Sequence, residues 1–104
     1  GAVVRDSILW EKCVVEEGAV LDRVICDKRC VIGQGAHVGA GAETPPNDEQ
    51  PGSLTCGATV LGMDVHVPPG ATVGRNCIIY PRAGEEQLGH RPVPSGTTVR
   101  TPTR

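Results

Sequence analysis

The sequence predicts a single all-β domain, a parallel β-helix of hexapeptide repeats with about four coils. Three observations predict this fold. Val, Ile or Leu recurs every six residues, a small residue follows four positions later, and 14 Gly and 9 Pro mark frequent turns. The 104 residues include one Trp, one Tyr and no Phe, so the aromatic side chains that usually dominate a small core are missing. A repeat in which neighbouring coils stabilise one another is the alternative to such a core.

The six-residue recurrence occurs in two runs, which one irregular segment separates. The positions that we expect to point inward are Val3, Leu9, Val15, Leu21, Cys26, Ile32, Val38, Thr55, Leu61, Val67, Val73 and Ile79. Ten of these 12 residues are Val, Ile or Leu, whereas 24 such residues in 104 predict about three. The register needs one five-residue step, between Leu21 and Cys26.

A second position of the repeat holds mostly small residues. They are Ser7, Cys13, Ala19, Ile25, Cys30, Ala36, Ala42, Thr59, Val65, Ala71, Cys77 and Ala83. A large side chain inside each strand and a small one beside each turn fit a narrow three-sided coil. Three hexads complete one coil, and successive coils are expected to stack at roughly the 4.8 Å spacing of neighbouring strands.

The hand of the coil does not follow from the periodicity. Parallel crossover connections are right-handed in about 98% of cases. The sequence is, however, similar to hexapeptide-repeat proteins, and that resemblance implies a single-stranded left-handed parallel β-helix.

Two segments interrupt the repeat. Residues 43–54 combine three Pro with acidic and small residues, which predicts a loop that leaves one corner and returns to the next coil. Residues 84–92 form a second irregular stretch. The segment Val93–Val99 recovers one hexad, and we expect the tail, residues 100–104, to be frayed. The whole chain, 1–104, is therefore expected to be one β-helix domain.

The charge pattern excludes several classes of partner. The net charge is −2, and no run of Lys or Arg exceeds two residues, so we expect neither nucleic acid nor a membrane surface as a partner. No stretch approaches the roughly 20 apolar residues of a membrane span. We therefore expect a cytoplasmic protein. Because the apolar pattern begins at Val3 without any lead-in, we also expect the chain to be a fragment of a longer protein.

Five cysteines without a secretion signal favour reduced thiols. Cys13, Cys30 and Cys77 occupy the small position of the repeat and Cys26 an inward position, so we interpret these four as small core residues. Cys56 lies beside the predicted loop and is the exception. Because Cys13 and Cys30 lie three hexads apart, we expect them to stack on adjacent coils, although in-register parallel strands orient two side chains poorly for a disulfide.

The three histidines raise the question of a metal or a catalytic base. His37 and His66 share the position before an inward residue and are expected to lie on one outer face, and His90 lies in irregular sequence. A zinc site needs three or four ligands at defined geometry, so we expect solvent-facing His residues and no metal. A hexapeptide acyltransferase with a His base, or a carbonic-anhydrase-like protein, remains an open alternative.

The most informative outward positions are aliphatic. Val14, Val31, Val60 and Ile78 each precede an inward residue, so the alternation of a strand turns them outward. If the loop at 43–54 preserves the count of faces, the four form one stripe, which predicts an interface. Strand propensity on a solvated face is the alternative interpretation.

The residues that carry the repeat also carry a family resemblance. The chain resembles the C-terminal β-helix of sugar-phosphate nucleotidyltransferases, most closely the glucose-1-phosphate adenylyltransferase (ADP-glucose pyrophosphorylase) family. The segments concerned are Ser7–Lys12, Val15–Arg23, Ile25–Lys28, Val67–Asn76 and Val93–Thr97. The five-residue step that places Asp-Lys directly after Cys26 is the most telling of these features.

The resemblance implies a division of roles. In that family an N-terminal α/β catalytic domain carries the Gly-rich nucleotide loop and uses Mg²⁺, and the β-helix serves structure, oligomerisation and regulation. None of the catalytic motifs can be carried onto this sequence, so we expect no catalytic residues, no cofactor and no metal in this chain. The implied partners are the N-terminal catalytic domain and neighbouring subunits of a homo-oligomer. Because Cys26 and the segment 83–91 depart from the family pattern, a mannose-1-phosphate guanylyltransferase-like parent is the alternative.

Overall fold

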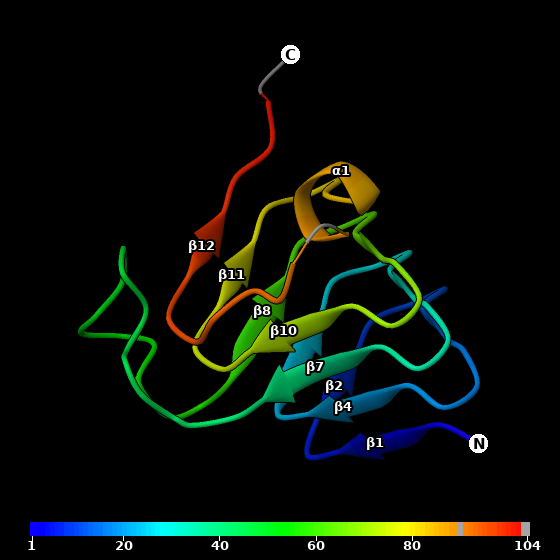
Figure 1. Ribbon diagram of the computed structural model, residues 1–104, viewed down its shortest axis with the longest axis horizontal. Coiled ribbons are helices and arrows are strands. Elements are labelled where there is room, and N and C mark those ends of the chain that lie inside the picture. Colours follow the sequence, from blue (N-terminus) through cyan, green and yellow to red (C-terminus); the bar gives the residue numbers. More distant parts are fainter. Residues whose placement is uncertain (90, 103–104) are drawn as a thin grey trace.

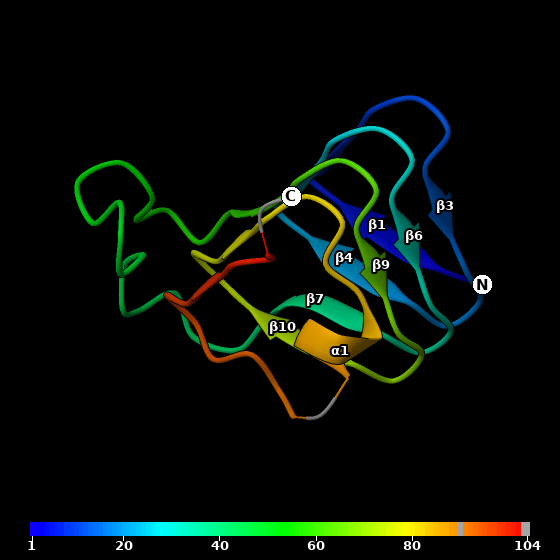
Figure 2. The same cartoon turned by 90° about the horizontal axis from the view of Figure 1, so that it is seen from above.

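The chain winds into a stack of three-sided coils, as the repeat predicts. The computed structural model describes residues 1–89 and 91–102. Figure 1 shows the coils stacked one above another, from the N-terminus at the bottom to the C-terminus at the top, and Figure 2 shows the same stack obliquely from above. All the strand pairs are parallel, and the described residues hold only one short helix. Hexapeptide repeats wound in this way have the architecture of a left-handed parallel β-helix.

Three parallel sheets form the three faces of the stack. The first face contains β1 (Val3–Arg5), β4 (Val20–Asp22), β7 (His37–Ala40) and β10 (Thr72–Gly74). The second face contains β2 (Ile8–Leu9), β5 (Val24–Cys26), β8 (Thr59–Leu61), β11 (Ile78–Ile79) and β12 (Thr98–Val99). The third face contains β3 (Val14–Val15), β6 (Val31–Ile32) and β9 (His66–Val67). Each strand therefore pairs with the equivalent strand of the next coil.

The register corrects the start of the predicted repeat. Val4, rather than Val3, pairs with the inward Leu21, so the first side of the first coil is also one residue short of the repeat. The same shortening before Cys26 makes Val24 the buried residue, and it turns Ile25 outward. Ile25 therefore does not belong among the small inward positions.

The interior is filled by aliphatic side chains and thiols from successive coils. Leu21, Ile32, Leu61 and Ile79 are among the largest buried side chains, each at most 1% exposed. Positive φ values occur at Gly18 and at 13 other described residues, most of which lie at the tight corners between strands. Gly39 shows how tight the packing is, because a Cβ atom there would lie 2.2 Å from the backbone oxygen of Asp22.

The excursion from the third coil is longer than the sequence predicts. It spans residues 41–58, from the end of β7 to the start of β8, and contains no helix or strand. Thr55, an expected inward position, lies within this loop and not on a strand. The loop stands out to one side in Figures 1 and 2. It occupies a single corner, so the third coil still continues from the first face to the second.

Two buried asparagines hold the loop against the coils. The Asn76 side chain donates to the carbonyl oxygens of Glu43 and Pro45 and accepts a hydrogen bond from the Gly57 N–H. The Asn47 side chain donates to the Asn76 carbonyl oxygen at 2.9 Å. Because both asparagine side chains are fully buried, these contacts fix both ends of the loop.

The C-terminal end of the stack is closed by irregular structure. The segment 84–92 contains the one-turn helix α1 (Glu85–Leu88), which takes the place of a third-face strand in the fourth coil and buries Leu88. Val93 returns to the first face as a single bridge to Val73, and β12 restores the second face. Arg100 pairs with Glu49.

The start of the predicted tail is held against the coils by side-chain contacts and is not frayed. The Thr101 hydroxyl donates to the Pro81 carbonyl oxygen at 2.9 Å. Residues 103 and 104, the end of that tail, lie outside the described part. Across the described residues, no helix is long and apolar enough to cross a membrane.

Candidate functional site

An aliphatic row runs up the second face. Ile8 pairs with Ile25, Ile25 with Val60, and Val60 with Ile78, so the four outward side chains lie one above another on consecutive strands. Ile8 is 57% exposed and Ile25 is 38% exposed, and the two later residues are half-buried. We name these four residues the aliphatic row. It is the longest unbroken series of outward aliphatic side chains along one described face.

The predicted stripe of Val14, Val31, Val60 and Ile78 is not one surface. Val14 and Val31 are partners on the third face, where the next residue in register is His66. Val60 and Ile78 belong to the second face. The prediction placed them together by counting residues across the loop, whereas the loop inserts all its residues at one corner without changing the order of the faces. The interface role of these residues stays a prediction.

The predicted interface omits Ile8 and Ile25, because the shortened step before Cys26 places Ile25 at the small position of the repeat. Both precede an inward residue, as Val60 and Ile78 do. The sequence contains one signal for this row. Ile8 and Ile25 are separated by the length of one coil, and Val60 and Ile78 are separated by the same length within one residue.

A hollow lies beside the row at the level of the first three coils. It has a volume of about 360 Å³ and is lined by Trp10, Ile25, Asp27, Val60, Leu61 and Gly62. Trp10 is 60% exposed, so this large aromatic side chain stands at the hollow with most of its surface in contact with solvent. Gly62 allows the next coil to pack closely against it, because a Cβ atom there would lie 2.7 Å from the Pro81 nitrogen.

The second face carries polar and charged side chains at its C-terminal end. The Arg100 guanidinium lies 4.6 Å from the centre of the Tyr80 ring, a cation–π arrangement. Its partner is the Glu49 carboxylate on the loop, and hydrogen bonding to that carboxylate raises the pKa of Arg100. The apolar part of the face is therefore confined to the earlier coils.

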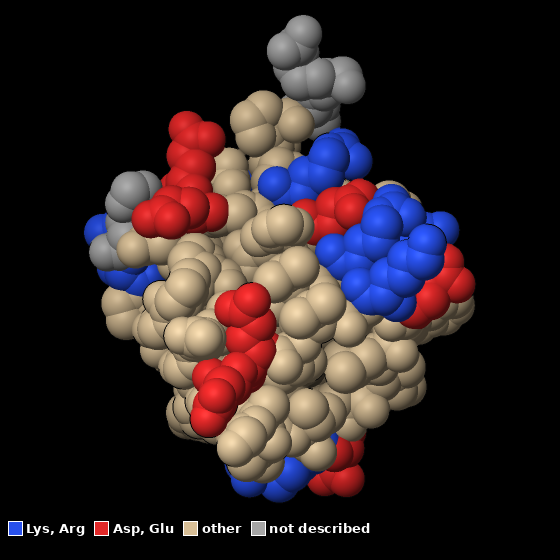
Figure 3. Space-filling model, turned by 90° about the vertical axis from the view of Figure 1, so that its right-hand side faces the viewer, with Lys and Arg blue, Asp and Glu red and all other residues tan. Residues whose placement is uncertain are grey.

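The third face is less continuous. Val14 is exposed and Val31 half-buried, and the row then ends in the exposed His66. Figure 3 looks onto this side of the molecule and shows a largely uncharged surface with separate acidic groups, and Lys and Arg side chains gathered with acidic ones at an upper corner. At the corner before β6, Arg29 pairs with Asp64 at a closest N–O distance of 2.8 Å.

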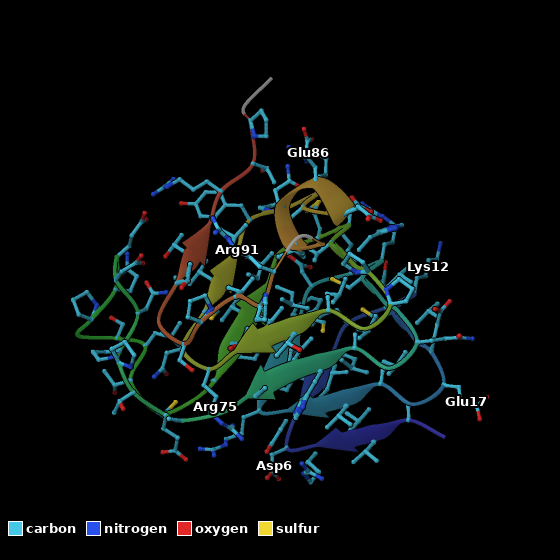
Figure 4. All side chains as sticks on the ribbon, in the orientation of Figure 1. Asp6, Lys12, Glu17, Arg75, Glu86 and Arg91 are labelled. Carbon is cyan, nitrogen blue, oxygen red and sulfur yellow. The ribbon has the colours of Figure 1, made fainter. Side chains whose placement is uncertain are left out.

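A charged ladder marks the corner at the base of the loop. Arg75 donates to the Asp22 carboxylate at 2.9 Å and to the Gly41 carbonyl oxygen at 2.9 Å, and Arg5 lies 3.6 Å from the same carboxylate. Figure 4 shows Arg75 beside the ends of β7 and β10, next to this loop. Hydrogen bonding by Arg75 lowers the pKa of Asp22 below its ordinary value. The arrangement joins coils and loop electrostatically.

The cysteines lie largely where the repeat predicts. Cys26, Cys30 and Cys77 are buried, Cys13 is half-buried and Cys56 is exposed. Burial raises the pKa of Cys13 and of Cys77. A hydrogen bond between Cys26 and Cys30 lowers the pKa of Cys30 to about 7 and raises that of Cys26.

The histidines do not converge on one surface. His37 lies on the first face in register with Val20 and Thr72, and His66 lies on the third. The expectation of a shared face was wrong, again because residues were counted across the loop. His90 lies outside the described residues. Within the described part of the chain, no three His, Cys, Asp or Glu side chains gather closely enough to hold a metal ion. The absence of zinc stays a prediction.

These features together favour a contact surface over a reaction centre. The aliphatic row and Trp10 offer side chains that would gain free energy on burial. Among residues 1–89 and 91–102, the ionisable groups with shifted pKa values are either paired with opposite charges or are thiols. Ion pairs and packed thiols account for these shifts without any catalytic role.

The chain is similar to known hexapeptide-repeat proteins. A family model described as GlmU-like, C-terminal hexapeptide matches residues 1–57. A glucose-1-phosphate adenylyltransferase of Thermomicrobium roseum is 46% identical over 95 residues, which cover 91% of this chain and 22% of that protein. One of Acetivibrio thermocellus is 29% identical over 99 residues, with 95% and 23% covered. One of Leifsonia xyli is 38% identical over 71 residues, with 66% and 16% covered.

The chain thus spans less than a quarter of the length of these relatives, and it matches their C-terminal part. No solved structure matches it significantly. The family model covers more than half of the residues, and its hexapeptide repeat is the one that the strands display. The chain therefore belongs to the GlmU-like C-terminal hexapeptide family.

Proposed function

We propose that the chain is the C-terminal β-helix domain of a glucose-1-phosphate adenylyltransferase and serves its structure, oligomerisation and regulation. The match to three proteins of that name carries the proposal, because it extends over 91% and 95% of this chain in two of them but only 22% and 23% of the relatives. The parent enzyme would transfer adenylyl from ATP to glucose 1-phosphate and release pyrophosphate. We also propose a cytoplasmic location and a role in glycogen or starch synthesis.

Catalysis is assigned to the rest of the parent protein. Transfer to a sugar phosphate requires a cradle for the nucleotide phosphates and carboxylates that hold Mg²⁺. Neither a Gly-rich nucleotide loop nor a Walker motif occurs in the sequence. The fold also offers little room for a phosphate cradle inside the coils, since the side chains of neighbouring coils fill the interior.

An activity assay tests this assignment. The purified chain, incubated with ATP, glucose 1-phosphate and Mg²⁺, is expected to release no pyrophosphate. The longer native protein is expected to do so, and its preference for ATP with glucose 1-phosphate over GTP with mannose 1-phosphate separates the two candidate parents. Turnover by residues 1–104 alone would contradict the assignment.

We propose the aliphatic row, with Trp10 beside it, as the contact surface of the domain. Its occupant is the N-terminal catalytic domain of the parent or a neighbouring subunit of a homo-oligomer. Complete burial of an Ile or Val side chain contributes about 1.5–3 kcal/mol. Four partly exposed side chains and one Trp therefore supply several kcal/mol before the costs of association.

Two matched double substitutions test this surface. Ile25→Lys with Val60→Lys places charge in the middle of the aliphatic row, and Val14→Lys with Val31→Lys places the same charge on the third face. All four side chains point outward, so each pair leaves the interior intact. In the full-length parent, sedimentation and pyrophosphate release are expected to show weaker assembly or lower activity for the first pair only. Equal behaviour of the two pairs would mean that the aliphatic row is a solvated face.

A further inference from the structure

Three thiols meet at one corner of the first two coils. Cys26 ends β5, and Cys30 follows it across the turn that leads to β6. Cys13 occupies the equivalent position in the preceding coil, because Val14 and Val31, the residues that follow the two cysteines, are partners in the third sheet. Cys30 therefore has a thiol neighbour in its own coil and another in the coil before it.

The thiols of Cys13 and Cys30 are held in the same way. The Cys13 thiol donates to the Asp27 carbonyl oxygen at 3.1 Å, and the Cys30 thiol donates to the Gly62 carbonyl oxygen at 3.1 Å. Each acceptor belongs to the following coil, so both side chains point along the stack toward the C-terminal end. The Cys13 thiol thus reaches the level of the second coil, to which Cys30 belongs.

The two cysteines lie at matching corner positions of adjacent coils. Paired residues on in-register parallel strands have side chains that run side by side. Cys13 and Cys30 lie just before β3 and β6, respectively, and are not part of either strand. Neighbouring coils are separated by about 4.8 Å, which falls within the range of about 4.4–6.8 Å between the Cα atoms of a disulfide.

We propose that Cys13 and Cys30 form a redox-active dithiol that closes to a disulfide between the first two coils. Cys13 is half-buried and open to a small reagent, whereas Cys26 and Cys30 are fully buried. Cys13 is therefore the thiol that an oxidant reaches first, and Cys30 is the thiol that resolves the intermediate.

The oxidant class is a low-molecular-weight disulfide such as glutathione disulfide. The Cys13 thiolate attacks one sulfur of the reagent, which breaks its S–S bond, forms a mixed disulfide at Cys13 and releases one glutathione. The Cys30 thiolate then attacks the Cys13 sulfur, which forms the protein disulfide and releases the second glutathione. The protein loses two electrons and two protons, and the reagent takes up both.

The bond would strengthen the coil that has the fewest neighbours. Among the described residues the first coil stacks on the second alone, and its inward residues Val4 and Leu9 are 44% and 37% exposed. In a stack stabilised by nearest neighbours, such a terminal coil opens first. A crosslink across a loop of about 15 residues raises the folding equilibrium constant roughly a hundredfold by constraining the unfolded chain.

Trypsin separates the three thiols, which makes the test direct. Cleavage after Lys and Arg places them in the peptides Cys13–Arg23, Val24–Lys28 and Cys30–Arg75. The third peptide also contains the exposed Cys56, so all proteins carry Cys56→Ser. The chain is incubated with glutathione disulfide, its remaining thiols are alkylated, and the digest is analysed by mass spectrometry before and after reduction.

The expected product links the first and third peptides. Its formation should raise the urea midpoint of the chain, and dithiothreitol should reverse both changes. Cys13→Ser should abolish the link, whereas Cys26→Ser should retain it. If a variant fails to fold, the protein that retains Cys13, Cys26 and Cys30 still tests the proposal, because the linked peptides identify the two cysteines of the disulfide. A link between the second and third peptides, a lasting mixed disulfide at Cys13, or no oxidation of the folded chain would each overturn the proposal.

Discussion

Asn76 offers the sharpest test of how the loop is held. This corner residue is fully buried and has φ of 57°. Its side-chain amide donates to the Glu43 oxygen at 2.7 Å and the Pro45 oxygen at 3.1 Å, and its side-chain oxygen accepts from the Gly57 N–H at 2.8 Å. One side chain therefore satisfies groups at both ends of the loop.

The expected loss of folding free energy follows from the number of polar groups that lose a hydrogen-bond partner. Asn76→Gly keeps the positive φ without strain but removes all three hydrogen bonds. Each buried polar group left unsatisfied costs about 1–3 kcal/mol, so we expect a loss of about 2–4 kcal/mol, since the carbonyl nearest the surface can turn to water. Asn76→Ala adds about 1 kcal/mol, because the left-handed region is unfavourable for a residue with a Cβ atom. Such losses are large against a total stability of about 5–15 kcal/mol.

The chain supplies a matched control in Arg82. This residue occupies the next corner of the same coil with φ of 68°, and its backbone N–H bonds to the Met63 oxygen, whereas none of the described hydrogen bonds joins it to the loop. Arg82→Gly is expected to change stability by less than about 1 kcal/mol. Urea unfolding followed by circular dichroism compares the variants. Equal midpoints for Asn76→Gly and Arg82→Gly would refute the argument that the loop is anchored by this amide.

Two further predictions concern thiols and pH. Thiol labelling of the native chain under reducing conditions should show one fast site, Cys56, and a slower one at the half-buried Cys13, because the other three cysteines are buried; four or five fast sites would contradict the register. Asp22→Asn should destabilise the chain at neutral pH, because Arg75 holds the pKa of Asp22 below its ordinary value and so favours the ionised folded state. That contribution is complete above the unfolded pKa of about 3.9 and disappears as the pH falls through the lower folded value. The difference in urea midpoint between Asp22→Asn and the unchanged chain should therefore shrink on acidification, and a constant difference would argue against the ion pair.

The local repeat was predictable because each hexad contains its own signals. An inward Leu21 or Ile32, a small residue at the next corner and a turn between them are all readable within six residues, and the structure buries both side chains. The shortened step before Cys26 was readable as well. The equivalent step before Leu9 was not, because Val3 and Val4 are both aliphatic and either one satisfies the pattern.

The assignment of faces could not be read from residue numbers. In a β-helix, the face on which a strand lies depends on how many sides precede it. A loop inserted at a corner adds residues but adds no side. The loop 41–58 leaves after β7 and returns at β8, so Val60 follows Ile25 on the second face. Only the strand pairing reveals this. The resulting error moved two residues of the predicted stripe to another face, and it also separated His37 from His66.

The same geometry explains why we propose a contact surface on the outside of this domain. Three short sides surround a core of small and aliphatic residues, among which Ala19, Cys30 and Ala36 are fully buried. The corner residues are needed for tight turns. The residue type can therefore vary mainly at the outward positions, which stack into rows because each coil repeats the one below it. On the second face this repetition turns single exposed residues, each unremarkable alone, into a continuous aliphatic row with Trp10 beside it. A continuous row is what a partner domain can bury, because the free energy of apolar contact grows with the contiguous area removed from water.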